Sequence, residues 1–142
     1  MKRTSHQMMV DEFMRLAKQE IPEKPIEPSE EVRLLRAKLI YEEALETINA
    51  LGVSIINNEF KITGPFDMVE VVDGCCDLKV VTTGTLTAIG VDDIDVQLEV
   101  DKNNLDKFGP GHSIREDGKL IKPPNHQPPN IRQILIEQGW NN

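Results

Sequence analysis

The segment LIYEEALETINA, residues 39–50, decides the fold, because it has the pattern of a helix yet carries three glutamates within five positions. Helical periodicity relates these acids to the apolar residues before them. One stripe, with steps of four, three and four residues, contains Leu35, Leu39, Glu42 and Glu46. Glu43 lies one step around the helix. The acids therefore continue a row whose first members are expected to face the core.

A second segment, VEVVDGCCDLKVV at residues 69–81, shows the same pattern. At about 100° per residue on a helix, Glu70, Asp73 and Asp77 fall within about 60° of one another. Apolar and small residues extend their row along the helix. If the two helices pack side by side, we expect up to six carboxylates to converge on one site.

Acids on a single helix are usually solvated, and either segment alone would favour that interpretation. Two acidic stripes that both continue apolar rows favour a site, because repulsion and desolvation would otherwise keep some of the carboxyls protonated. A ligand set made only of oxygen suits Mg²⁺, with Mn²⁺ as an alternative, and does not suit zinc. Mg²⁺ commonly takes phosphate oxygens as further ligands, and two such ions can activate a water and stabilise a phosphate leaving group.

The rest of the chain predicts one mostly helical domain over residues 1–142. Prolines and glycines separate the elements, and Ser29 and Asp67 have the character of helix caps. The first helix has an apolar stripe of Met9, Phe13 and Leu16. We expect helices at 5–20, 30–51, 67–89 and 92–107, a small β-hairpin or a loop at 53–64, an irregular basic tail at 111–130, and a last helical turn or two within 130–139.

Composition excludes several classes of protein. The net charge of −8 argues against binding of a nucleic-acid polymer. No apolar run is long enough to cross a bilayer, and no apolar stretch follows the basic residues at the N-terminus as in a secretory signal. We therefore expect a cytoplasmic protein without membrane contact. The two cysteines, Cys75 and Cys76, are adjacent and are expected to be buried and unreactive.

The charge is unevenly distributed along the chain. Residues 102–132 carry a net charge of +3, which leaves −11 on the remainder. An acidic body with a basic tail could hold a polyanion together with its metal ions, although a solvated surface explains the charge alone. Asn104 and Lys107 share a helical face, and Lys119 and Lys122 follow in the tail. We expect these four residues to contact phosphates that the metals do not reach.

Four segments together resemble the all-α nucleoside triphosphate pyrophosphohydrolase superfamily, which includes MazG-like proteins, dimeric dUTPases and phosphoribosyl-ATP pyrophosphohydrolases. They are YEEALE, which supplies EExxE at 42–46, and EVVDGCCD (70–77), NNLDKFGP (103–110) and EDGKLIKPPNHQPPNI (116–131). The resemblance implies an all-α, four-helix-bundle-like fold. It also implies Mg²⁺-dependent hydrolysis between the α- and β-phosphates of a nucleotide, with a monophosphate and pyrophosphate as products.

Carried over by position, the resemblance makes Glu42 and Glu46 metal ligands and makes Glu43 a ligand or the base that orients the attacking water. The family's second acidic element, ExxD, is met by Glu70 and Asp73. An alternative alignment ends this element on Asp77, with Gly74 where a glutamate is expected and Asp73 as its substitute. Both alignments leave three candidate ligands on this helix, namely Glu70, Asp73 and Asp77. Asn104, Lys107 and Lys119 would contact phosphates.

The function predicted from the sequence is a nucleotide pyrophosphohydrolase that cleans the nucleotide pool. Within the same class, the substrate could be dUTP, dCTP or phosphoribosyl-ATP. From another class, the chain could be a non-catalytic helical binding module stabilised by a metal. Two long helices are few for a core that is poor in aromatic residues, so we expect a homodimer or a dimer of dimers.

Overall fold

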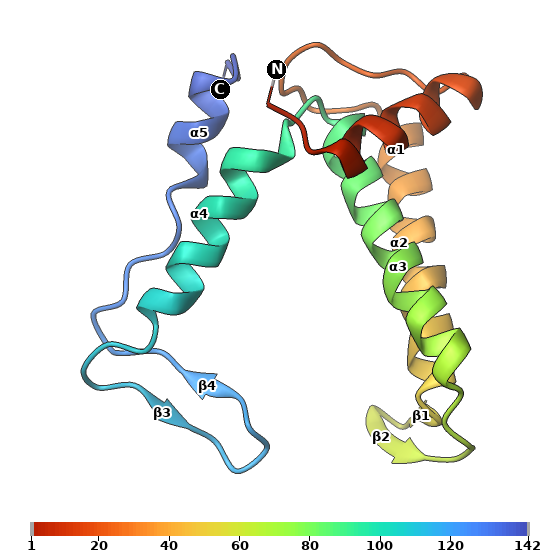
Figure 1. The fold of residues 1–142 in the computed structure, drawn as a ribbon, viewed down its shortest axis with the longest axis vertical. Coiled ribbons are helices and arrows are strands. Elements are labelled where there is room, and N and C mark those ends of the chain that lie inside the picture. Colours follow the sequence, from red (N-terminus) through yellow and green to blue (C-terminus); the bar gives the residue numbers. More distant parts are fainter. Residues whose placement is uncertain (1, 142) are drawn as a thin grey trace.

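The computed structural model describes residues 2–141 and is mostly helical (Figure 1). This arrangement confirms the predicted all-α class and the small β-hairpin between the two central helices. The helices are α1 (Ser5–Leu16), α2 (Glu30–Ala50), α3 (Met68–Ala88), α4 (Asp93–Asp106) and α5 (Ile131–Glu137). The strands are β1 (Val53–Ile56), β2 (Glu59–Ile62), β3 (Ser113–Ile114) and β4 (Leu120–Ile121).

The two long helices, α2 and α3, lie side by side and antiparallel (Figure 1). Each begins at the predicted cap: Ser29 Oγ accepts from the backbone N–H of Val32 at 3.3 Å, and Asp67 Oδ1 accepts from that of Glu70 at 3.1 Å. At two glycines of α3 the helices approach so closely that an added Cβ would meet a side chain of α2. The helix pair is therefore closely packed along its shared face.

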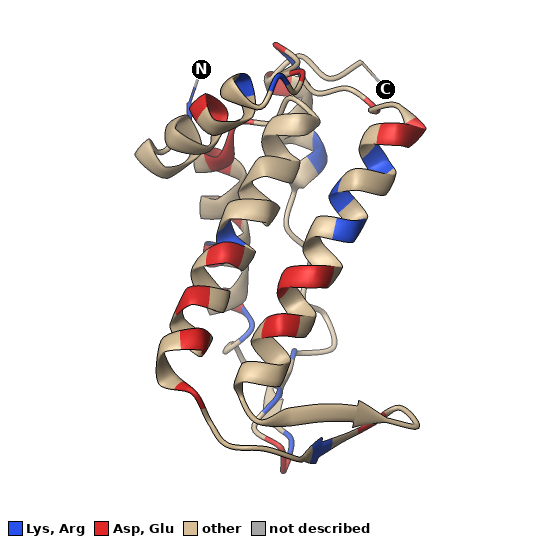
Figure 2. Ribbon diagram, turned by 90° about the vertical axis from the view of Figure 1, so that its right-hand side faces the viewer, with Lys and Arg blue, Asp and Glu red and all other residues tan. Residues whose placement is uncertain are grey.

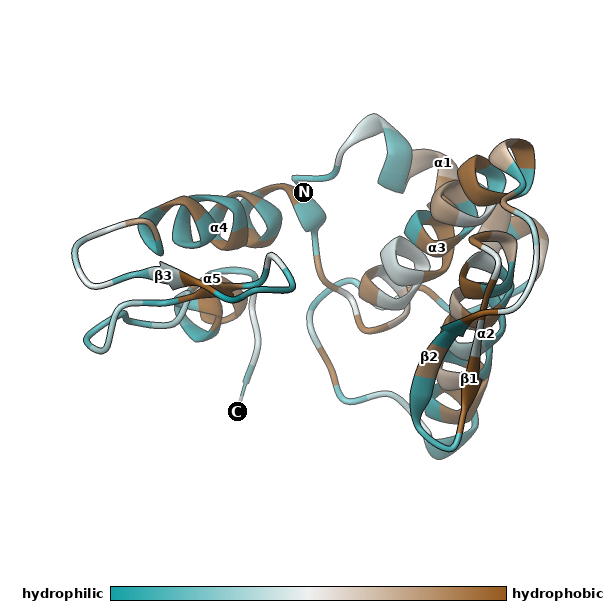
Figure 3. Ribbon diagram, turned by 90° about the horizontal axis from the view of Figure 1, so that it is seen from below, coloured by the Kyte–Doolittle hydropathy of each residue, from teal (hydrophilic) through white to brown (hydrophobic). Residues whose placement is uncertain are grey.

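The hairpin of β1 and β2 connects these helices at one end. Its turn consists of Asn57 and Asn58, both with positive φ (50° and 62°), which asparagine tolerates better than most residues. The register opposes Val53 to Ile62 and Ile55 to Phe60, so one face of the hairpin is entirely apolar. Phe60 is 71% exposed and Ile62 is 79% exposed, and Figure 3 shows hydrophobic positions on both strands.

The first helix packs against the other end of α3. Val10 and Met14 form a small core with Ala88, and partly buried apolar residues of α2, α3 and the connector surround it. The predicted stripe of Met9, Phe13 and Leu16 does not face this core, because α1 buries its opposite side and leaves the stripe exposed. The helix also ends at Leu16, earlier than expected, and Lys18 has a positive φ of 58° in the turn that follows.

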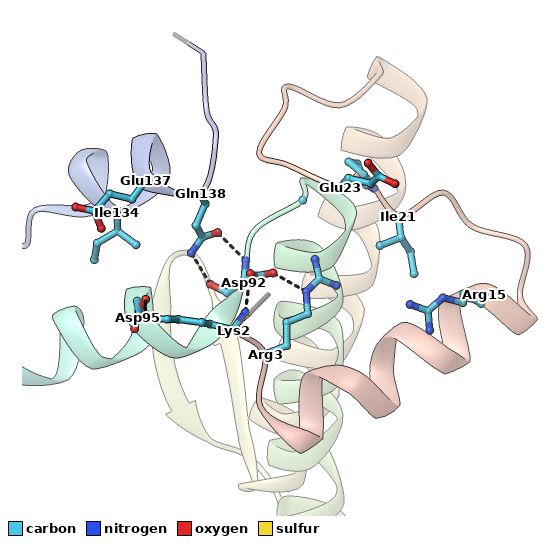
Figure 4. A pocket seen from close by; sticks show the side chains of 12 residues that line it. Lys2, Arg3, Arg15, Ile21, Glu23, Asp92, Asp95, Ile134, Glu137 and Gln138 are labelled. Atoms are coloured by element: carbon cyan, nitrogen blue, oxygen red, sulfur yellow. Dashed lines mark hydrogen bonds and ion pairs between the residues drawn. The ribbon is translucent and has the colours of Figure 1, made fainter.

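A buried polar hub, formed by Arg3, Gln7, Asp11, Thr87 and Asp92, joins α1, α3 and the start of α4. Arg3 Nη1 donates to Asp11 Oδ2 at 2.8 Å, and Arg3 Nε donates to Asp92 Oδ1 at 2.7 Å. Thr87 Oγ1 donates to Asp11 Oδ1 at 2.7 Å, while Gln7 Nε2 donates to Thr87 Oγ1 at 3.1 Å. Figure 4 shows Arg3 reaching Asp92, which also meets Gln138 near the end of α5.

Residues 93–141 form a separate α4–α5 arm. Helix α4 packs on α5, and the arm diverges from the α2–α3 pair below the hub (Figures 1 and 3). Asp92 precedes α4 without a side-chain capping hydrogen bond, because its carboxylate is engaged by Arg3 and by the backbone N–H of Lys2. The tail predicted to be irregular contains the short β3–β4 hairpin, in which Ser113 opposes Ile121.

Large apolar side chains cover much of the outside of the single chain, on every helix and on both hairpins. Both cysteines are free and exposed on α3, so the prediction of buried thiols was wrong for this chain. Within residues 2–141, no helix combines the length and the apolar character needed to cross a membrane.

Candidate active site

The centre of the candidate site is Glu43, on the face of α2 that meets α3. Thr47 lies one helical turn after Glu43 on α2, and its Oγ1 donates to the backbone carbonyl oxygen of Glu43 at 2.7 Å. The side chain of Glu43 is half-buried, and its Oε2 atom is buried with no hydrogen-bond partner. A buried carboxylate oxygen without a partner is unfavourable, so this atom calls for a donor or a cation.

Other carboxylates act on Glu43 from both helices. Local desolvation raises the pKa of Glu43, and the charges of Glu46, Asp77, Asp73 and Glu42 raise it further. The helix pair thus brings together five of the six predicted acids, which we call the acid cluster: Glu42, Glu43, Glu46, Asp73 and Asp77. Figure 2 shows acidic positions on the halves of α2 and α3 that lie nearer the β1–β2 hairpin.

Glu70, the sixth predicted ligand, is different. It lies in the first turn of α3, is exposed, and is not among the charges that shift the pKa of Glu43. Its backbone N–H donates the capping hydrogen bond to Asp67 Oδ1. The placement of the acids therefore favours Asp73 and Asp77 as the partners of the α2 glutamates.

The acid cluster fits a divalent cation in its chemistry. Within residues 2–141, no group of three or more His, Cys, Asp or Glu side chains is already arranged to hold a metal ion. The available donors are nonetheless all carboxylate oxygens, and one of them is buried and unpartnered. Hard oxygen donors of this kind suit Mg²⁺ or Mn²⁺. The residues that would hold it are Glu42, Glu46, Asp73 and Asp77, which surround Glu43.

The predicted phosphate-binding residues lie on the other arm. Lys107 Nζ donates to Asn104 Oδ1 at 2.8 Å, which confirms that these two side chains share a face of α4. Lys119 lies in the turn of the β3–β4 hairpin, where its backbone carbonyl accepts from Arg115, and Lys122 follows β4. Within the single chain, the structure does not bring these residues to the acid cluster (Figure 1).

A sizeable cleft lies away from the acid cluster, and none of the five acids lines it. A cavity of about 760 Å³ lies between the start of α1, the connector after it, the start of α4 and α5. Its basic residues are largely neutralised, because Arg3 pairs with Asp11 and Asp92, and Lys2 lies 3.1 Å from Asp95 (Figure 4). This cleft therefore offers little free positive charge to a phosphate group.

Sequence periodicity did not identify two residues at the centre of the site, Thr47 and Gly74. An added Cβ on Gly74 would lie 2.4 Å from Thr47 Oγ1, so α2 and α3 touch within the acid cluster. The available signal was a glycine inside an acidic helix, where it lowers helix propensity and therefore calls for a packing reason.

The family comparison agrees with this arrangement of helices and acids. A protein-family model described as phosphoribosyl-ATP pyrophosphohydrolase matches residues 10–104. The chain belongs to this family. Phosphoribosyl-ATP pyrophosphohydrolases form part of the MazG-like all-α nucleoside triphosphate pyrophosphohydrolase superfamily, and they typically depend on a divalent cation. The matched span includes all six acids but ends at Asn104, before Lys107, Lys119 and Lys122. A comparison with curated proteins finds no match.

Proposed function

We propose that this member of the phosphoribosyl-ATP pyrophosphohydrolase family is a Mg²⁺-dependent nucleotide pyrophosphohydrolase that cleaves the bond between the α- and β-phosphates. The observation that carries the proposal is the buried, unpartnered Oε2 of Glu43 among four further carboxylates from two helices. Family membership supports the reaction class, a pyrophosphohydrolase. The substrate and the metal go beyond family membership and belong to this proposal. The products are a nucleoside monophosphate and pyrophosphate.

The residues of the chain take distinct roles in this proposal. Glu42, Glu46, Asp73 and Asp77 hold the cation, which when bound neutralises phosphate charge and polarises the phosphoryl oxygens. Glu43 orients the attacking water and accepts its proton at the carboxylate. In-line attack on the phosphate then expels pyrophosphate.

The arm residues Asn104, Lys107, Lys119 and Lys122 are proposed to bind the phosphates that leave as pyrophosphate. Amide and ammonium donors of this kind suit phosphate oxygens. Because the arm diverges from the acid cluster of its own chain, these residues reach the substrate either when the arm closes or when they come from a second copy.

A homodimer or a dimer of dimers is proposed as the working form. The small core of Val10, Met14 and Ala88 contrasts with the apolar side chains exposed on every helix and on the hairpins. Exposed apolar surface on this scale is typical of a chain that is covered by a partner. A second copy would bury it and would add helices to the α2–α3 pair, as in a helical bundle.

The acidic net charge of −8 supports free nucleotides rather than a nucleic-acid polymer as substrates. We place the activity in the cytoplasm, in nucleotide-pool house-cleaning. The family description supports a second candidate substrate, phosphoribosyl-ATP itself. That compound therefore belongs in any substrate panel, beside canonical and modified nucleoside triphosphates that include dUTP and dCTP.

The test is hydrolysis of this panel by the 142-residue chain with Mg²⁺, with Mn²⁺ and with EDTA, in an assay that separates pyrophosphate from orthophosphate. Pyrophosphate with monophosphate, formed only with a divalent cation, is the expected result. Orthophosphate as the only inorganic product would show that the bond assignment is wrong. No product at all, combined with a melting temperature raised by Mg²⁺, would favour a non-catalytic binding module.

A further inference from the structure

We propose that Thr47 and Gly74 form a spacer between α2 and α3 that sets which size of divalent cation the acid cluster accepts. The inference rests on the proposed function, because it requires a cation at the acid cluster. It concerns two residues that bear no ligand atom, so their role is to position the carboxylates around them.

The contact between the two residues is unusually tight. A Cβ on residue 74 would lie 2.4 Å from Thr47 Oγ1, 3.1 Å from Thr47 Cβ and 3.2 Å from Thr47 Cα. Thr47 cannot easily move away, because it is buried and its Oγ1 donates to the Glu43 carbonyl oxygen at 2.7 Å. Only a residue without a side chain allows the helices this separation.

The spacer lies inside the acid cluster. Asp73 immediately precedes Gly74, and Asp77 lies three residues after it on α3. On α2, Glu43 lies one turn before Thr47, and its backbone carbonyl oxygen accepts the hydrogen bond from Thr47 Oγ1. A change in helix separation at this contact therefore moves the carboxylates of one helix relative to those of the other.

The separation of the two helices sets the distances between their carboxylates, and these distances determine which size of cation binds better. Mg²⁺ requires near-octahedral oxygen ligands at about 2.0–2.1 Å, whereas Ca²⁺ accepts more ligands in flexible geometry at about 2.3–2.6 Å. Alanine at position 74 would fall short of ordinary van der Waals contact with Thr47 by about 1 Å, which the helices must absorb by separating. A cluster widened in this way favours the larger cation.

The experiment measures cation binding rather than turnover. Isothermal titration of the metal-free 142-residue chain with Mg²⁺ and with Ca²⁺ compares wild type with Gly74→Ala. We expect Mg²⁺ affinity to fall about tenfold, as it does when residues that support metal ligands are altered, while Ca²⁺ affinity changes by less than about threefold. The ratio of the two affinities is the diagnostic quantity, because general destabilisation would not move it in one direction.

The chain offers a matched control in Gly84→Ala, the same substitution at the other glycine of α3 whose added Cβ would meet a side chain of α2. Its Cβ would meet the terminal Nη2 of Arg36 at 2.5 Å, away from the acid cluster. This variant should therefore keep the wild-type ratio of affinities. The double variant Thr47→Ala/Gly74→Ala removes the hydroxyl that blocks residue 74 and should restore the ratio toward wild type.

Unchanged ratios in Gly74→Ala would overturn the spacer, and so would an equal shift in Gly84→Ala. If Gly74→Ala does not fold, Thr47→Val presses a methyl against Gly74 and should shift the ratio in the same direction by less; an unshifted ratio there also overturns the proposal. If wild type hydrolyses nucleotides but Gly74→Ala keeps the wild-type affinity ratio, only the spacer proposal is refuted. If the ratio shifts but wild type hydrolyses nothing, only the enzymatic proposal is refuted. A wild type that binds neither cation refutes both proposals.

Discussion

Substituting Asp11 by alanine tests the polar hub most directly, because this carboxylate has partners on two sides. Its side chain is 2% exposed and accepts from Arg3 Nη1 at 2.8 Å and from Thr87 Oγ1 at 2.7 Å. The alanine variant leaves the Arg3 guanidinium buried with only Asp92 as its counter-ion, and leaves the Thr87 hydroxyl without an acceptor. Breaking a buried ion pair from one side costs about 3–5 kcal/mol of unfolding free energy.

The assay is urea unfolding followed by far-UV circular dichroism, at one fixed protein concentration and in EDTA, so that neither association nor metal binding differs between variants. The neighbouring acid Glu12 provides the matched control. It is 63% exposed and lies 3.6 Å from Arg15, an exposed pair that contributes at most about 1 kcal/mol. We expect Asp11→Ala to lose at least three times as much unfolding free energy as Glu12→Ala.

A double-mutant cycle separates the ion pair from simple loss of packing. Arg3→Met combined with Asp11→Ala removes both charges, so the double variant should be more stable than the sum of the single effects predicts, by about 1–3 kcal/mol. Equal losses for Asp11→Ala and Glu12→Ala would refute the reasoning, because the hub would then contribute no more than a solvated surface pair.

Three further predictions concern the acids and the hairpin. Glu46→Gln should abolish cation-dependent turnover without lowering the melting temperature in EDTA, because Glu46 is exposed and repels Glu43; substantial residual turnover would remove it from the mechanism. Burial of Asp92 opposes ionisation, but the hydrogen bond from Arg3 and the other contacts of the carboxylate together lower its pKa. The stability that the ionised Asp92 contributes is therefore present above the ordinary pKa near 3.8, and it is lost as pH falls through the lower native pKa. Urea midpoints between pH 2.5 and 6 should therefore fall at the acid end for wild type and change less for Asp92→Asn; parallel curves would contradict this. Phe60→Lys should lower the oligomer mass in light scattering, while Glu59→Lys on the opposite hairpin face should not, and equal masses would place the interface elsewhere.

Local chemistry made the central helices and the hairpin predictable. Ser29 and Asp67 cap their helices as expected, since each side chain accepts a hydrogen bond from a backbone N–H in the first turn. The Asn57–Asn58 pair forms the hairpin turn because both residues adopt positive φ. These features depend on residues a few positions apart, and short-range sequence patterns contain that information.

The hub could not be predicted, because it depends on distant partners. Arg3 and Asp92 are 89 positions apart, and nothing near either residue indicates the other. The apolar stripe of α1 was a misleading guide for the same reason. Within the single chain, α1 buries the side that carries Gln7, Val10, Asp11 and Met14, and two of these residues are polar because the distant hub pairs them.

The candidate site lies between these cases. Helical periodicity predicted two acidic stripes, and the antiparallel pairing of α2 and α3 places carboxylates from both stripes around Glu43. Periodicity could not reveal how far α2 and α3 are offset from each other along their length. That offset places Asp73 and Asp77 beside Glu43, leaves Glu70 outside, and brings Gly74 against Thr47. Whether these acids ligate a metal stays a prediction.

Stability and the proposed chemistry occupy opposite ends of the α2–α3 pair. The apolar core and the polar hub lie where α1 meets the end of α3, while the acid cluster lies toward the β1–β2 hairpin, where most side chains are exposed. Converging carboxylates repel one another and weaken the end that carries them. The packed end holds the helices together against this repulsion, and a bound cation would relieve it at its source. Divalent cations should therefore order the hairpin end of the pair more than the hub end.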